Sequence, residues 1–220
     1  MGAAPSVVRD DPAAHAILRA AHERAYRFPT TFEGFTAAFT YADETQSARG
    51  SVEVRSPRAI ALHAPEAPEP VREWITRELG SMAGHRWPRA YDDADGRWTL
   101  SLASQDHWGH VIQVHDDPFA SSYRVRDGRI LQVSRRTDPV QFSILLLSHT
   151  AAPDGRLLPA TFVVAYWYHE QERLIRVEAY ADAYVEVEGT LLPSRREVTT
   201  TDDRGVTRRE LVLTEHRLLA

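Results

Sequence analysis

Three histidines lie within nine residues of the chain, in the stretch HWGHVIQVH at positions 107 to 115. Imidazole is a common zinc ligand, so this spacing raises the question of a metal site. If the stretch is one strand, His107 and His115 lie on one face roughly 26 Å apart, and His110 lies on the other face. A turn at Trp108 and Gly109 could bring His107 beside His110, but a third ligand would be missing. We therefore expect no metal at these histidines.

His169 and Glu170 form a second candidate, in YWYHEQE at positions 166 to 172. A histidine beside a carboxylate could act as an acid–base catalyst. The alternative is a hairpin turn, HEQE, that links two strands, because turns commonly contain such polar residues. No nucleophile is specified nearby, so we favour the turn, with an enzyme that uses His169 and Glu170 as the alternative.

The stretch from 175 to 188 alternates so regularly that it predicts one long strand with two different faces. One face carries charged and aromatic side chains: Arg176, Glu178, Tyr180, Asp182, Tyr184, Glu186 and Glu188. This face could bind a polar ligand and so serve an enzyme, but alternating charges are also typical of a solvated sheet surface. We favour the solvated surface.

The other face of the same stretch is apolar, and we expect it to point inward. It comprises Ile175, Val177, Ala179, Ala181, Ala183, Val185 and Val187. The three small alanines in succession leave space that either a closely packed helix or a ligand must fill. We predict a ligand site lined by Val177, Ala179, Ala181, Ala183, Val185 and Trp74.

Two helices are expected early in the chain. The first follows Asp11 and Pro12, a cap and a proline at the first helical position, and has an apolar stripe from Ala14 to Phe28. The second begins near Pro70, with a stripe from Val71 to Met82, and ends at Gly84. Between them, residues 34 to 63 alternate as an antiparallel hairpin does.

The second half of the chain reads as strands separated by turns. Asp-Gly and related pairs at 93–97, 126–129, 153–156 and 202–205 favour tight hairpin turns. The resulting fold class is α+β, with a curved, extended antiparallel sheet of about eight or more strands, a half-open barrel, packed around two amphipathic helices. We expect a flexible N-terminus over residues 1–10 and a single domain over 11–220.

Composition limits the classes of function. The 220 residues carry a formal net charge of -5 and show no basic cluster, so nucleic acid is not expected as a partner. Cysteine and lysine are absent, which excludes thiolate and Schiff-base chemistry. No apolar stretch is long enough for a signal peptide or a membrane span, so we expect a cytoplasmic protein without cofactor. Its oligomeric state is open.

Several strings resemble an uncharacterised bacterial family, DUF3386, over nearly the whole chain. They are LRAAHERAYRFPTTFEGFTAAFTY, GSVEVRSPR, VREWITRELGSMAGHR, SSYRVRDGRILQVSRR and LLPSRREVTTTDDRG. The resemblance implies a sheet that curls around helices, similar to the half-open barrels of lipoprotein carriers of the LolA type. The sequence departs from those carriers by having no export signal. The resemblance implies no activity.

We therefore expect a non-catalytic binding protein that holds an apolar small molecule in the concavity of the curved sheet. The alternatives are the enzyme described above and a protein-interaction or assembly factor. The latter would use exposed aromatic residues such as Trp108 and Tyr180.

Overall fold

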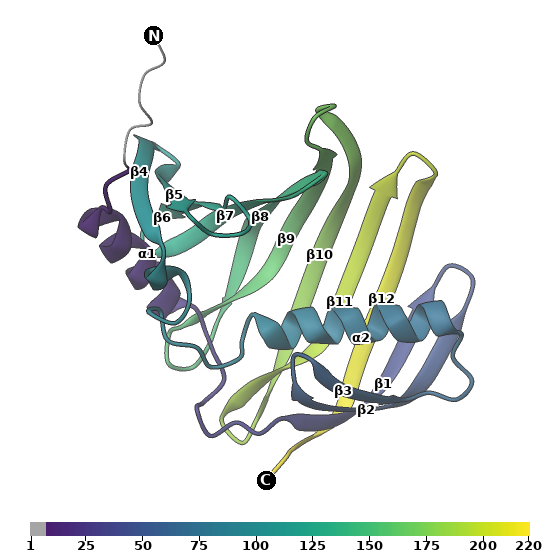
Figure 1. Ribbon diagram of the computed structural model, residues 1–220. Helices are drawn as coiled ribbons and strands as arrows, with labels where there is room; N and C mark the ends of the chain where they lie inside the picture. Colours follow the sequence, from purple (N-terminus) through teal and green to yellow (C-terminus); the bar gives the residue numbers. More distant parts are fainter. Residues whose placement is uncertain (1–7) are drawn as a thin grey trace.

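Helix α1 (Pro12–Arg24) begins where the sequence predicts its cap. Asp11 accepts a hydrogen bond from the backbone N–H of Ala13 at 2.8 Å, and Pro12 occupies the first turn. The helix ends before Phe28, which the apolar stripe had included, because the chain becomes extended at Ala25. The computed structural model describes residues 8–220 (Figure 1). Most of the predicted flexible N-terminus, residues 1–7, lies outside the described residues.

Helix α2 (Glu69–Gly84) spans the predicted range and buries the predicted stripe. Its buried residues include Val71, Trp74, Ile75, Leu79 and Met82, spaced three and four apart so that they share one face. Pro70 lies in the first turn, where a missing N–H leaves no hydrogen bond unmade. Neither α1 nor α2, the two α-helices of residues 8–220, is long and apolar enough to cross a membrane.

The remaining elements are twelve strands and one short 3-10 helix. In chain order they are β1 (Phe35–Asp43), β2 (Ser47–Ser56), β3 (Ala59–His63), the 3-10 helix η1 (Asp95–Arg97), β4 (Thr99–Asp106), β5 (Gly109–His115), β6 (Ser122–Arg126), β7 (Arg129–Thr137), β8 (Val140–Ala151), β9 (Leu157–Tyr168), β10 (Arg173–Val187), β11 (Thr190–Asp202) and β12 (Gly205–Leu218). The predicted hairpin between the helices is thus three strands, β1 to β3.

All twelve strands form one antiparallel sheet, in the order β3-β2-β1-β12-β11-β10-β9-β8-β7-β6-β5-β4. The sheet is strongly curved and does not close, so β3 and β4 are its edges (Figure 1). The predicted α+β class with a curved, half-open antiparallel sheet is confirmed. The turns at 126–129, 153–156 and 202–205 each join neighbouring strands as predicted. The prediction for 93–97 is wrong, because these residues form a turn and the 3-10 helix before β4.

Two separate hydrophobic cores lie on the inner, concave face of the sheet. Helix α1 packs on β4 to β7 in one core, which includes Leu18, Leu100, Ile112 and Tyr123. Helix α2 packs on β1, β2, β11 and β12 in the other core, which includes Trp74. The two helices therefore cover the two ends of the sheet. The inner face of the middle strands lies between them (Figure 1).

The faces of β10 are the reverse of the prediction. Ala179 and Ala183 are exposed, and Val185 is 37% exposed, so the alanine face is the outer, convex one. Asp182 is buried and Tyr180 packs against the α2 core, so the charged and aromatic face is the inner one. The predictions of an inward alanine face and of a solvated polar face are both wrong. The physical reason is that the polar side chains on β10 find partners on α2 and β11, as the next subsection describes.

Candidate functional site

The three histidines of 107–115 do not lie on one strand. His107 and Trp108 form the turn between β4 and β5, so the single-strand interpretation is wrong. His110 pairs with Gln105 across that hairpin, and His115 contacts Ser101 Oγ at 2.8 Å. Within residues 8–220, no three histidine, cysteine, aspartate or glutamate side chains are grouped so that they could hold a metal.

His169 and Glu170 lie at the tip of the β9–β10 hairpin, so the predicted turn is confirmed. The backbone N–H of His169 donates to Pro139 O at 3.0 Å, and its Nδ1 contacts Gln141 Oε1 at 3.1 Å. Glu170 is exposed. His169 is therefore fixed by the neighbouring β7–β8 turn rather than by the adjacent carboxylate.

The six residues predicted to line a ligand site do not come together. Trp74 is buried in the α2 core, where its ring packs against Tyr41 with centroids 5.3 Å apart. The five residues of β10 (Val177, Ala179, Ala181, Ala183 and Val185) lie on the outer face of the sheet, and Trp74 lies on the inner side. The structure therefore does not bring these six residues together around one cavity.

The inner face of β10 instead contributes to a buried ionic network beneath α2. Arg196 of β11 binds both oxygens of Asp182, with Nε to Oδ1 at 2.8 Å and Nη2 to Oδ2 at 2.6 Å. Its Nη1 contacts Glu78 Oε2 of α2 at 3.1 Å. Arg86, just after α2, lies 3.8 Å from Asp182 and donates to Tyr184 Oη. All four charged side chains are at most 6% exposed.

Ion pairing offsets the free-energy cost of burying these charges. Burial alone lowers the pKa of Arg196, but the hydrogen bonds to Asp182 and the charges of Asp182 and Glu78 outweigh it and raise the pKa above its ordinary value. The aromatic rings around Arg196 add cation–π contacts, at 5.1 Å to Tyr180 and 5.7 Å to Phe162. The network ties α2 to β10 and β11.

Beside the network, the inner face of the middle strands is apolar, and Ile144, Leu146 and Phe162 on it belong to neither core. Residues opposite one another on paired strands share a face. One row on the inner face comprises Val133 of β7, Ile144 of β8 and Val164 of β9. Leu146 of β8 and Phe162 of β9 form a pair beside it. Except for Val164, these side chains are only half-buried. The rings of Phe162 and Tyr180 stack with centroids 4.5 Å apart.

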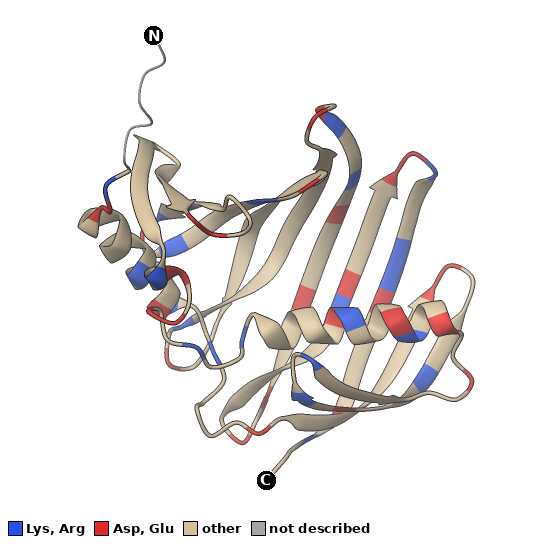
Figure 2. Cartoon of the chain, in the orientation of Figure 1, with Lys and Arg blue, Asp and Glu red and all other residues tan. Residues whose placement is uncertain are grey.

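Strands β8 and β9 contain no charged residue along their whole length. Figure 2 shows no charged residue in the part of the sheet formed by β8 and β9, whereas charges lie on both helices, at several turns and on β10 to β12. Strands that are apolar on both faces are usually covered on both sides. Here α1 and α2 pack over the two ends of the sheet, and Ile144, Leu146 and Phe162 between them remain partly exposed.

Arg135 of β7 borders this apolar surface. It pairs in register with Phe142 of β8, and its guanidinium lies 5.6 Å from the ring centre of Phe119. Its Nη2 donates to Tyr123 Oη at 3.3 Å, and Tyr123 in turn donates to Asp95 at 3.0 Å. Its Nε is buried and has no hydrogen-bond partner. Arg135 thus has donor capacity that the described residues do not use.

His85 lies in the turn after α2, and its side chain is exposed. The surrounding protein reduces its solvation, and the positive charges of Arg86, Arg196, Arg135 and Arg27 repel its protonated form, so both effects lower the pKa of His85.

The site residues that the sequence did not reveal are Glu78, His85, Arg86, Arg135 and Arg196. Their contacts join segments far apart in the sequence, such as Glu78 and Arg196, and no local spacing signals them. The sequence analysis names Asp182 and Tyr180 but places them on a solvated surface. One available signal was the absence of charge in β8 and β9, which is unusual for a strand with a solvated face.

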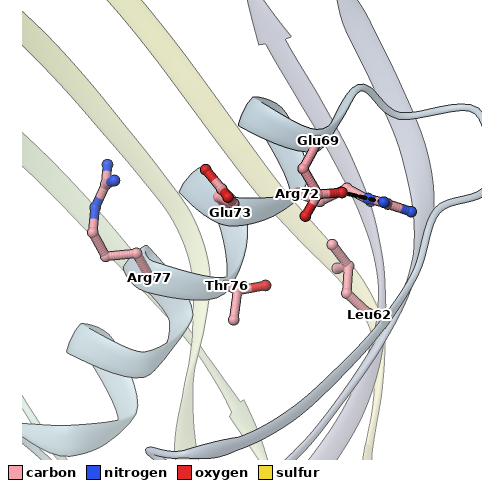
Figure 3. Close-up of a pocket in the computed structure, with 6 residues that line it drawn as sticks. All are labelled: Leu62, Glu69, Arg72, Glu73, Thr76 and Arg77. Atoms are coloured by element: carbon pink, nitrogen blue, oxygen red, sulfur yellow. Dashed lines mark hydrogen bonds and ion pairs between the residues drawn. The ribbon is translucent and has the colours of Figure 1, made fainter.

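Two hollows in the surface lie outside this inner face. The larger, of about 500 Å³, lies between α2 and β3 and is lined by Leu62, Glu69, Arg72, Glu73, Thr76 and Arg77 (Figure 3). Arg72 and Glu69 in it are already paired with each other. The other, of about 350 Å³, lies beside α1 and includes Ile17, His110 and Val125. Neither hollow includes Arg135 or the apolar row of β7 to β9, so we place the candidate site on the inner face, where both occur.

Comparison with known proteins identifies a family but no function. A family model described as "Protein of unknown function (DUF3386)" matches residues 9–219. No curated protein matches the chain. The complex of Pseudomonas aeruginosa MucA/MucB is 11% identical and covers 94% of this chain and 99% of that chain, with a TM-score of 0.24. MucB in complex with MucA(peri) gives the same identity and coverage with a TM-score of 0.22. Scores this low support no argument about this chain.

Proposed function

The chain belongs to the DUF3386 family of unknown function, and from this premise we propose that it is a binding protein. Its ligand is an apolar small molecule that lies against the inner face of β7 to β10, between α1 and α2. The proposal moves the expected ligand from the alanine face of β10 to the opposite face of the sheet.

The observation that supports this proposal most directly is the half-buried apolar surface on two strands without charge. Ile144, Leu146 and Phe162 are not part of either core, although they lie on the same face as both. Exposed apolar surface of this kind stabilises a complex when a ligand removes it from water, by about 25 cal/mol for each Å² covered. The flanking network and Arg135 would orient the ligand.

The experiment compares two neighbouring residues on opposite faces of β8. Native mass spectrometry of the purified protein tests for a retained small molecule, and titration with a fluorophore that brightens in apolar surroundings measures binding. We expect Ile144→Glu, on the inner face, to abolish binding. We expect Leu145→Glu, on the outer face, to leave binding unchanged. Circular dichroism checks that both variants fold.

The opposite pattern would contradict the proposal. If Leu145→Glu lost the fluorophore while Ile144→Glu kept it, the apolar binding surface would be the outer face. Failure of the unmodified protein both to retain a small molecule and to bind the fluorophore would also reject it.

The second candidate is a protein-interaction or assembly factor. One observation favours it: Leu145 and Leu147 on the outer face of β8 are 41% and 65% exposed, beside the exposed alanines of β10. Trp108 is 57% exposed, but Tyr180 packs against the α2 core and is not available to a partner. Loss of self-association or of a co-purifying protein in Leu147→Glu would support this candidate.

A further inference from the structure

Arg135 has features of a residue that binds an anion. Its side chain has no ion pair with any carboxylate in the described part of the chain, and the only hydrogen bond of that side chain is the 3.3 Å contact to Tyr123. Its Nε is buried without a partner. An unmade hydrogen bond on a buried donor is costly, and for a charged group more so. An anion beside the guanidinium would offset that cost by pairing with its charge.

The other charged side chains described on the inner face are paired. Asp182 and Glu78 pair with Arg196, and Arg176 and Glu178 pair with each other at 2.9 Å. Asp95 reaches Arg135 only through Tyr123. Arg135 therefore keeps a positive charge that no carboxylate of the described residues contacts directly, which suits an anionic ligand.

The apolar surface that would receive the rest of the ligand starts directly next to Arg135. The apolar row of Val133, Ile144 and Val164 begins beside Arg135, since Val133 is two residues before it on the same face of β7.

We propose that the inner face binds a long-chain carboxylate, with the head group against Arg135 and the chain along the apolar row of β7 to β9. This inference rests on the proposed function and specifies its ligand. The planar guanidinium fork fits a carboxylate through two parallel hydrogen bonds.

The test uses three ligands with the same twelve-carbon chain: dodecanoate, dodecanol and dodecyl phosphate. Their affinities for the unmodified protein are measured at pH 7.5 by displacement of the fluorophore. We expect dodecanoate to bind at least about tenfold more tightly than dodecanol, the usual gain for a hydrogen bond to a charged group. Arg135→Gln should remove this preference, because the charge that pairs with the carboxylate is lost.

Arg136→Gln is the matched control. Arg136 is the next residue on β7, lies on the other face and pairs with Asp138 at 2.6 Å, so its variant should keep the preference for dodecanoate. Equal affinities for dodecanoate and dodecanol would overturn the carboxylate site and leave the proposed function intact. Tighter binding of dodecyl phosphate than of dodecanoate would also overturn it. Binding of none of the three would reject the proposed function itself. The ligand comparison needs no variant, so it holds even if Arg135→Gln fails to fold.

Discussion

At the scale of single residues, the buried ionic network fixes the position of α2 and also makes the fold sensitive to substitution of its members. Among residues 8–220, Arg196 alone pairs with both Asp182 and Glu78, and all three side chains are almost fully buried. Removing one partner of such a network leaves charges without compensation in a region of low dielectric. The position of α2 over β10 and β11 therefore depends strongly on one side chain.

We expect Arg196→Met to lower the free energy of unfolding by about 3–5 kcal/mol, because Asp182 and Glu78 would remain buried and unpaired. Arg195→Met is the control. Arg195 is the adjacent residue and also pairs with two carboxylates, Glu197 and Glu210, but its side chain is 47% exposed. Its loss should cost no more than about 1 kcal/mol. Urea denaturation measures both, and equal losses would show that the network contributes no more than a surface ion pair.

At the scale of elements, β10 shows that a regular alternation does not by itself identify the inner face. We expect Ala181→Leu to change the free energy of unfolding by less than about 0.5 kcal/mol, because the added atoms extend from the outer surface. Tyr180→Ala, one residue earlier, removes a ring that stacks on Phe162 and packs against the α2 core, and should cost about 3–5 kcal/mol. Thermal unfolding compares the two. Strong destabilisation by Ala181→Leu would show that the outer face is closely covered.

The sequence predicted most elements but not which faces they bury. The cap at Asp11, the stripe of α2 and the Asp-Gly turns are local signals, read within a few residues of one another. The inner face of β10 depends on Arg196 of the next strand and on Glu78 of α2, which is far from both Asp182 and Arg196 in the sequence. Their pairing reverses the rule that the apolar side of a strand is buried, since alanine gains little from burial.

At the scale of the whole molecule, the two cores differ in how much of the chain they need. The α1 core uses residues between Ala14 and Val133. The α2 core joins residues between Tyr26 and Leu218. Strand β1 is completed by β12, with Phe35 opposite Leu218. One core is thus formed by the first part of the chain, while the other requires both its beginning and its end.

We expect the strands of β4 to β7 to form before β1 pairs with β12 during refolding. Neighbouring hairpins close short loops, whereas the β1–β12 pairing closes a loop of nearly the whole chain and costs more conformational entropy. Pulse-labelled hydrogen exchange measures the order. Amides that join β5 to β6 should be protected earlier than amides that join β1 to β12. Protection of both sets at the same rate would indicate a single cooperative step.

The same arrangement has a consequence during synthesis on the ribosome. When Val133 has emerged, every residue of the α1 core is available, but the apolar stripe of α2 still lacks β11 and β12. The nascent chain therefore carries an amphipathic helix whose apolar face is only partly covered, by β1 and β2, until residues 190–218 have been translated. During that interval α2 is the natural target for a chaperone. The α2 side of the surface proposed for the ligand is therefore completed only when β12 pairs with β1.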